Sequence, residues 1–192
     1  MKKITFPAVM IATALLSGLL ALLFALLYRH FAAGWILSAA ITFFTVFYHF
    51  AMRLAVGTLV PNRFSHRSFW FRPRDFEAGL YEKLRLKKWK DHMPTYDPRL
   101  FSLKENTLDE IVNNMCQAEV VHEIIILLSF IPLLFSMVWD AFFVFLITSL
   151  LAALLDLSFV MMQRYNRPRI LRLAQKRAAT QPQRSINNER KD

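Results

Sequence analysis

Near its N-terminus the chain carries a long apolar run without charged side chains. Residues 4–28 contain no Asp, Glu, Lys or Arg and consist mainly of Leu, Ala and Phe. About 20 helical residues are enough to cross roughly 30 Å of hydrocarbon. A secretory signal peptide has an apolar core of only about 7–15 residues, followed by a cleavage site and polar chain. Here a second apolar run follows directly after Arg29 and His30. The first run therefore predicts a transmembrane helix.

Three further apolar segments are long enough to cross a membrane. One covers residues 32–54, and a later apolar block divides near Asp140 into segments 120–139 and 141–162. Hydrophobic residues make up 55% of the chain and the mean hydropathy is +0.31, whereas a soluble domain has about 45–50% apolar residues even with Gly counted. The sequence predicts an all-α polytopic membrane protein with about four transmembrane helices.

The charged residues divide the chain and indicate its orientation. Two Lys precede the first span, eleven Lys and Arg lie in residues 61–118, and nine lie after residue 162. Cytoplasmic segments carry such an excess of Lys and Arg, so we expect both termini and the central segment in the cytoplasm. The expected divisions are two N-terminal helices (1–60), a basic amphipathic segment (61–118), two further helices with an arginine-rich motif (119–173) and a basic, disordered tail (174–192).

Composition and missing motifs exclude several classes of protein. The net charge of +10 and the pI near 10.1 would suit nucleic acid, but the basic residues flank the spans, where topology already explains them. We therefore expect membrane lipids as partners and no nucleic acid. The single Cys116 excludes an internal disulfide. A zinc protease helix needs a second His four residues after His122, where Ile126 stands, and we expect no metal site.

Ionisable residues inside apolar segments are functional candidates because they are costly in hydrocarbon. His49 and Arg53 are four residues apart, so a helix places both on one face, where they could bind one anion. The alternative is that Arg53 only reaches lipid phosphate. Glu119 and His122 also share a helical face, which suits a general base beside a carboxylate, or simply a helix start that meets water. Asp156 has no base near it in sequence, so a partner must come from another helix.

Two basic segments flank the last two spans. The string QRYNRPRI, residues 163–170, offers three arginines whose planar forks suit phosphates. The alternative is a cytoplasmic anchor for the span. Pro168 is expected to end or kink the helix there. The string EKLRLKKWK, residues 82–90, is typical of a surface that lies on anionic lipid or that docks a phosphorylated acyl donor.

These motifs together resemble a known family. QRYNRPRI after an apolar span, QAEVVHEIII in the preceding span and the basic KKWKD string are similar to the glycosyl-4,4'-diaponeurosporenoate acyltransferase family over residues 71–173. This family comprises small integral proteins of bacterial cell membranes that serve the last step of staphyloxanthin-type carotenoid synthesis. The matched positions, which the resemblance implies as site residues, are Trp89, Lys90, Glu119, His122, Gln163, Arg164, Tyr165, Asn166, Arg167 and Arg169.

The resemblance implies transfer of a fatty acyl group onto the primary hydroxyl of a glucose attached to a C30 carotenoid acid. The partners would be an acyl donor, with acyl-CoA as co-substrate, and a lipid-soluble acceptor in the bacterial inner membrane; no resident cofactor is implied. Our hypothesis takes His122 as the base and Glu119 as its orienting partner. The arginines of QRYNRPRI would hold phosphates, and His49 with Arg53 would contact the oxyanion or a headgroup.

Other interpretations stay open at this stage. His49 or His92 could be the base in place of His122, because His92 lies five residues before Asp97, the spacing of a His/Asp pair in glycerolipid acyltransferases. A non-catalytic scaffold that binds lipid through its basic segment would also fit the composition. A transporter that relays protons through His49 and Asp156 is a third class, and four spans would then require a dimer. The sequence alone leaves the oligomeric state open.

Overall fold

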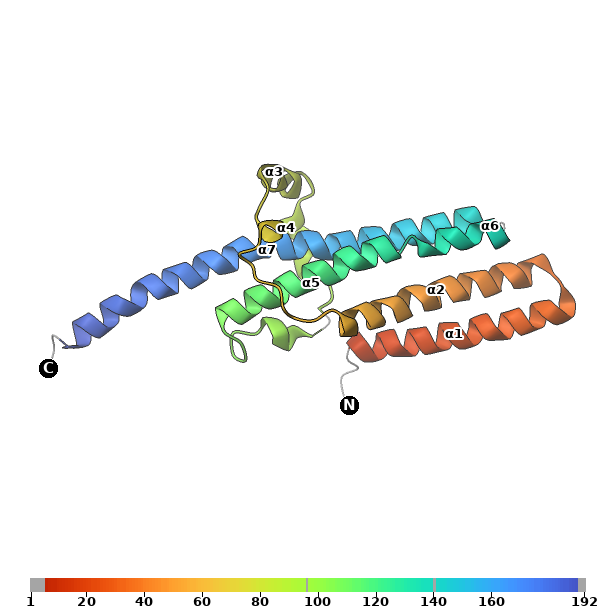
Figure 1. The fold of residues 1–192 in the computed structure, drawn as a ribbon, viewed down its shortest axis with the longest axis horizontal. Helices are drawn as coiled ribbons and strands as arrows, with labels where there is room; N and C mark the ends of the chain where they lie inside the picture. The colour runs from red at the N-terminus through yellow and green to blue at the C-terminus, as the bar shows by residue number, and fades with distance from the viewer. Residues whose placement is uncertain (1–5, 96, 140, 190–192) are drawn as a thin grey trace. The chain divides into compact units, whose positions relative to one another are not determined.

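The computed structural model describes residues 6–95, 97–139 and 141–189, and their regular structure is entirely helical (Figure 1). In chain order the elements are α1 Phe6–Phe31, α2 Gly34–Leu59, η1 Phe69–Phe71, α3 Asp75–Lys83, α4 Leu86–Trp89, η2 Lys90–His92, η3 Pro98–Phe101, α5 Leu108–Leu128, η4 Ile131–Phe135, α6 Ser136–Trp139 and α7 Phe142–Glu189. The label η marks a 3₁₀ helix.

Four helical stretches are long and apolar enough to cross a membrane. They are Phe6–Phe31, Gly34–Leu59, Leu108–Phe135 and Phe142–Lys176. The prediction of about four apolar helices is confirmed, and the protein is a multi-pass membrane protein. The two later helices are longer than the apolar segments from which they were predicted, because their polar ends continue the same helices.

The described chain divides into two compact units. The first unit consists of residues 6–61, 94–95, 120–139 and 141–159. The second consists of residues 62–93, 97–119 and 160–189. Helices α5 and α7 therefore each contribute one part to each unit.

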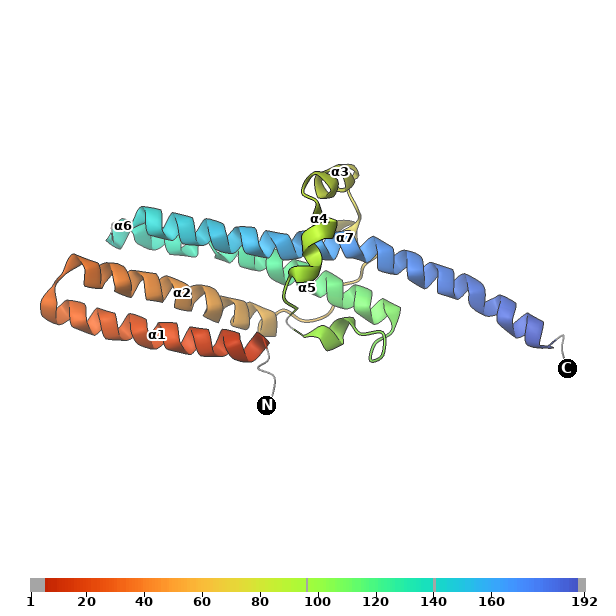
Figure 2. The ribbon, with the colours of Figure 1, turned by 180° about the vertical axis from the view of Figure 1, so that it is seen from behind.

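An antiparallel pair of helices, α1 and α2, begins the first unit (Figures 1 and 2). The turn between them is short: Ala32 has a φ of 50° and its N–H donates to the Tyr28 carbonyl at 2.8 Å, which closes the end of α1. The helices approach closely at Gly18, where an added Cβ would lie 3.0 Å from the Phe47 ring. Glycine therefore sets the distance between this pair.

Helix α2 packs against the later part of α5 in the same unit. Met52 and Val56 of α2 form a buried apolar cluster with Ile125 of α5. The Tyr48 hydroxyl donates a hydrogen bond of 2.8 Å to the Leu128 carbonyl near the end of α5. This contact satisfies both a phenol and a terminal helix carbonyl inside an apolar layer, where unpaired polar groups are costly.

Helix α5 begins at Leu108, in the second unit, well before the predicted apolar segment 120–139. The N–H and hydroxyl of Thr107 both donate to the Glu110 carboxylate, at 2.7 and 2.9 Å, and the Glu110 N–H returns a bond of 3.3 Å to the Thr107 hydroxyl. This capping box starts the helix at Leu108. One turn later Asn114 accepts from Asn62 at 2.6 Å and donates to a carbonyl of η3, which fixes the neighbouring loops.

Helix α7 continues through Pro168 to Glu189, so the helix does not end at this proline. The kink expected there and the disorder expected after residue 173 stay predictions. Proline inside a helix costs about 3 kcal/mol or more. Arg164 and Arg167, in the turn before it, make buried ion pairs that offset this cost.

Candidate active site

A histidine and an aspartate from different helices meet in the first unit. Nδ1 of His122 on α5 lies 2.8 Å from Oδ1 of Asp156 on α7. The Asp156 side chain is 1% exposed and that of His122 is 21% exposed. The imidazole also stacks on the Phe159 ring, with centroids 4.6 Å apart and planes 9° apart. The carboxylate and the ring together fix the imidazole plane, and the exposed part of the side chain can meet a reactant.

The buried Asp156 carboxylate has a second partner, Arg53 of α2. A guanidinium nitrogen of Arg53 pairs with Oδ2 of Asp156, so the two carboxylate oxygens are divided between an arginine and a histidine. Arg53 also donates to the carbonyls of His49 at 2.9 Å and Ala152 at 3.3 Å. A buried carboxylate needs such pairing, because an uncompensated charge is strongly destabilising. Arg53 therefore supplies the partner that the buried Asp156 side chain needs among apolar helices.

His49 lies one turn before Arg53 on α2, on the same face, as predicted. Its residue surface is 6% exposed, and neither ring nitrogen has a hydrogen-bond partner within the described part of the chain. The ring contacts Tyr48 edge to face, with centroids 5.5 Å apart. Buried polar atoms without partners are uncommon and call for an explanation, such as a ligand.

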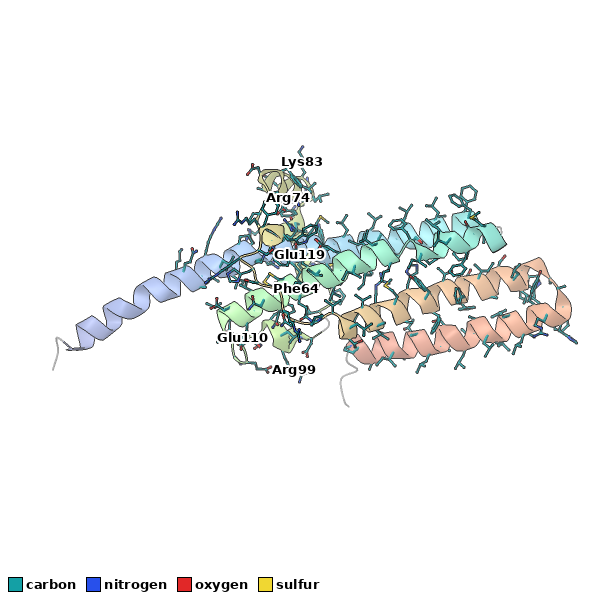
Figure 3. All side chains as sticks on the ribbon, viewed as in Figure 1. Phe64, Arg74, Lys83, Arg99, Glu110 and Glu119 are labelled. Carbon is teal, nitrogen blue, oxygen red and sulfur yellow. The ribbon has the colours of Figure 1, made fainter. Side chains whose placement is uncertain are left out.

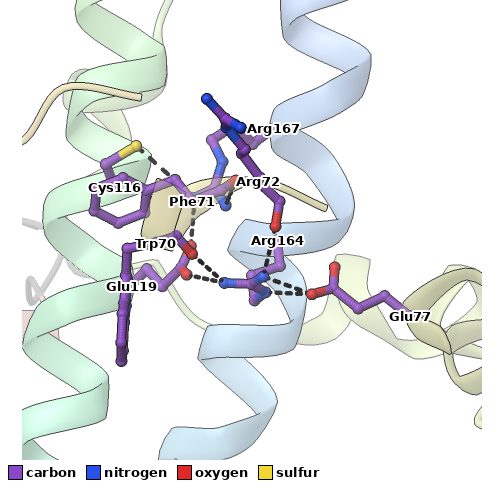
Figure 4. A network of polar contacts seen from close by, with 8 residues as sticks. All are labelled: Trp70, Phe71, Arg72, Glu77, Cys116, Glu119, Arg164 and Arg167. Atoms are coloured by element: carbon purple, nitrogen blue, oxygen red, sulfur yellow. Dashed lines mark hydrogen bonds and ion pairs between the residues drawn. The ribbon is translucent and has the colours of Figure 1, made fainter. Parts of the chain in front are cut away.

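The other predicted carboxylate, Glu119, belongs to a different cluster in the second unit (Figure 4). Oε1 of Glu119 accepts from Arg164 at 2.5 Å, and Oε2 pairs with Arg167. The Glu119 side chain is fully buried. Both oxygens are thus used by arginines, and the structure pairs His122 with Asp156 instead of Glu119. Two guanidinium groups compete better for a buried carboxylate than a neutral imidazole does, since charge-assisted bonds are stronger.

Arg164 is saturated by protein partners (Figure 4). It binds the Glu77 carboxylate of α3 through Nε at 2.8 Å and Nη2 at 2.5 Å, and it also reaches Glu119. Two further bonds, of 3.3 and 3.1 Å, go to the carbonyls of Trp70 and Arg72. An arginine has five N–H donors, and all are engaged here. This guanidinium ties α7 to α5, α3 and the loop around η1.

Arg167 is buried in the same cluster. It donates to the Phe71 carbonyl at 2.8 Å and contacts the Cys116 sulfur at 3.8 Å. Its guanidinium carbon lies 5.1 Å from the centroid of the Phe71 ring. Phosphate binding was predicted for Arg164 and Arg167. In the structure, their guanidinium groups already bind carboxylates and backbone carbonyls.

The remaining predicted residues surround this cluster without joining it. Arg169 is exposed, donates to the Tyr165 hydroxyl at 2.5 Å and covers its ring, while Tyr165 meets Tyr81 edge to face. Burial and the nearby Glu77 raise the pKa of Tyr81 to about 12. Of the other predicted residues, Gln163 is buried, and Asn166 and Lys90 are half-buried. The Trp89 indole donates to the Leu84 carbonyl at 3.0 Å.

Sequence reasoning missed two partners. Asp156 was recognised as an unusual acid within a span, but the helix that would face it could not be identified. Glu77 carried no signal, because a single acid in a charged segment is ordinary. Among the described residues, no group of three His, Cys, Asp or Glu side chains could hold a metal ion.

A multi-pass helical membrane protein with an oriented imidazole–carboxylate pair has the features of a membrane-bound group-transfer enzyme. The chain matches the model of the CrtO family, glycosyl-4,4'-diaponeurosporenoate acyltransferase, over residues 67–176, which is more than half of its length. The protein belongs to this family and is an acyltransferase of carotenoid biosynthesis. The resemblance seen in the sequence over residues 71–173 is thereby confirmed. No curated protein and no solved structure matches the chain.

Proposed function

We propose that the protein transfers a fatty acyl group from acyl-CoA to a sugar hydroxyl of a glycosylated carotenoid in the bacterial cell membrane. The acceptor follows from the family, whose activity is acylation of a glycosylated carotenoid acid. The observation that carries the proposal is the 2.8 Å contact between His122 and Asp156. It gives the chain an oriented base among helices that a lipid-soluble acceptor can reach from the bilayer.

In this proposal His122 is the general base and Asp156 its positioning residue. The Asp156 carboxylate holds the proton on Nδ1, which leaves Nε2 with its lone pair for the acceptor hydroxyl. Nε2 forms no hydrogen bond with a residue that the structure describes. The arrangement replaces the Glu119–His122 couple expected from the sequence, and it retains the base.

The reaction has two proton transfers that balance. His122 Nε2 takes the proton of the sugar hydroxyl as that oxygen attacks the thioester carbonyl carbon, so a C–O bond forms and an oxyanion develops. When the intermediate collapses, the C–S bond breaks and the imidazolium returns the proton to the leaving sulfur. The products are a sugar ester and a free thiol.

His49 is the residue we assign to the oxyanion or to the acceptor sugar. Its two unpartnered ring nitrogens are buried close to Arg53 on the same helical face. A donor that is already desolvated and fixed stabilises a developing charge without reorganisation. Arg53 itself is engaged by Asp156 and by two carbonyls, so we assign it the role of holding the Asp156 side chain in place.

The arginine-rich motif has a structural role in this proposal. Arg164 and Arg167 bind Glu119, Glu77 and backbone carbonyls, and this holds the loop around η1 and the helix α3 against α5 and α7. Arg169, Tyr165, Asn166 and Gln163 continue the same surface of α7, and they remain predicted contacts of the substrates.

The decisive experiment compares histidine variants in purified, detergent-solubilised protein. We expect His122→Ala to lose at least about 10²-fold in acyl transfer to a glycosylated carotenoid, the usual contribution of a general base. His30→Ala, at the exposed end of α1, is the matched control and should keep its activity. Full activity of His122→Ala would overturn the assignment, and loss in His92→Ala instead would move the base to the loop histidine.

A further inference from the structure

A polar pocket of about 690 Å³ lies in the second unit, away from the ion-pair cluster. The loop of residues 62–67 and the first turns of α5 line it, together with Leu100 and Asn106. Phe64 and Glu110 of this lining are labelled in Figure 3. This volume lies within the 300–1,000 Å³ typical of sites for small molecules and cofactors. Hydrogen bonds from Asn114 to the Leu100 carbonyl and from Asn62 to Asn114 hold the walls together.

The guanidinium groups of two arginines of the pocket have no partner among the described residues. Arg63 and Arg67 are exposed, and neither guanidinium group forms a hydrogen bond or ion pair with a described residue, although the Arg67 backbone N–H donates to the Ser65 hydroxyl at 3.4 Å. They differ in this respect from Arg164, whose donors are all bound to protein. Free guanidinium forks at the edge of a pocket are suited to bidentate contacts with phosphate oxygens.

The pocket also contains polar groups that form no hydrogen bond with a described residue. Oδ1 of Asn113 is buried and has no hydrogen-bond partner among the residues that the structure describes, and the same holds for Nδ1 of His66 in the loop of the arginines. The exposed Asp109 carboxylate has no partner among the described residues, whereas Glu110 is occupied by its cap on Thr107. The pocket therefore combines sites for anionic oxygens with sites for N–H or O–H donors. A purely anionic ligand would meet Asp109 unfavourably, and a neutral sugar would leave the arginines unused.

We infer that this pocket binds the nucleotide end of the acyl-CoA donor. Phosphates would lie on Arg63 and Arg67, and the adenine amino group and a ribose hydroxyl would donate to Asn113 and Asp109. A nucleotide presents both kinds of group at once, because it has phosphate oxygens together with an amino group and ribose hydroxyls. The inference rests on the proposed function, which takes acyl-CoA as the donor, and it assigns a site to the nucleotide of that donor.

Binding of free coenzyme A to the full-length protein in detergent tests the inference directly. We expect saturable binding by isothermal titration calorimetry, weakened at least about tenfold in the Arg63→Gln/Arg67→Gln protein, equivalent to about 1.4 kcal/mol. Arg74→Gln is the matched control, because Arg74 is exposed in the same unit and lies outside the pocket. Absence of binding to the wild type, or equal binding to both proteins, overturns the inference.

A second measurement separates this inference from the proposed function. The double arginine variant should raise the KM for an acyl-CoA at least about tenfold, yet leave transfer from the matching acyl-pantetheine, which lacks the nucleotide, unchanged. An equal loss with both donors would contradict the pocket assignment. Efficient transfer from an acyl carrier protein without coenzyme A binding would also overturn it, while the His122-dependent reaction would stand. Full activity of His122→Ala would instead refute the base without touching the pocket.

Discussion

In the first unit, the Asp156 carboxylate bonds to side chains of two other helices. One oxygen orients His122 and the other balances the charge of Arg53, and the side chain is almost completely buried. Removing one member of a buried ion pair costs about 3–5 kcal/mol, because the remaining charge loses its compensation. The proposed mechanism therefore couples activity and stability at this residue, and a test of its role must separate them.

A paired substitution separates the two effects. We expect Asp156→Leu alone to lose both activity and thermal stability, since it strands the Arg53 charge. Adding Arg53→Met should restore the unfolding temperature close to that of the wild type, because a matched apolar pair replaces the buried ions, while acyl transfer stays at least about 10²-fold reduced. Thermal unfolding in detergent and an acyl transfer assay provide the readouts. Recovered activity in the double variant would show that Asp156 serves folding only.

At the scale of elements, the sequence predicted the spans well and their partners poorly. Hydropathy located four apolar helices, because lipid demands about 20 apolar residues from each one. The early start of α5 was also encoded locally, in the Thr107 and Glu110 capping box, although the apolar pattern hid it. The choice of Asp156 over Glu119 for His122 depends on which helices become neighbours, and no local pattern carries that information.

The cluster at Glu119 also shows that a local sequence pattern does not reveal the partners of a side chain. The motif QRYNRPR was recognised as a concentration of arginine forks, and phosphate was the natural partner for them. In the folded chain, the guanidinium groups of Arg164 and Arg167 instead form ion pairs with acids of other helices. These acids are Glu119 of α5 and Glu77 of α3. The partners of Arg164 came from segments 45 and 87 residues distant in sequence, and no local pattern shows them.

A conservative substitution in this motif tests its structural role. Arg164→Lys should destabilise the protein by about 2 kcal/mol, because an ammonium group cannot reproduce the five directed bonds of the guanidinium. Arg169→Lys is the matched control in the same motif, since Arg169 is exposed and bonds only to Tyr165 in the described structure. Thermal unfolding and limited proteolysis of the loop around η1 measure the difference. Unchanged stability together with a raised KM for the acyl donor would instead support the predicted role of Arg164 in phosphate binding.

For the whole molecule, the unequal distribution of Lys and Arg predicts that the central segment and both termini share the cytoplasmic side. This sidedness matters for the chemistry, because a water-soluble acyl donor is available in the cytoplasm and the acceptor is dissolved in the bilayer. The α1–α2 turn would then face the opposite side of the membrane. Two glycines offer open positions for testing this, since an added Cβ at Gly34 or Gly79 meets no atom within 4 Å.

Single cysteines at these two positions should react with a membrane-impermeant maleimide from opposite sides. We expect Gly34→Cys, at the start of α2, to be labelled in intact spheroplasts, and Gly79→Cys, in α3, to be labelled only after the membrane is opened. The native Cys116 is fully buried and provides an internal background that should stay unlabelled in the folded protein. Labelling of Gly79→Cys in intact spheroplasts would reverse the orientation. It would also place the coenzyme A pocket of the second unit on the side where the donor is absent, so the proposed reaction would need a different acyl donor.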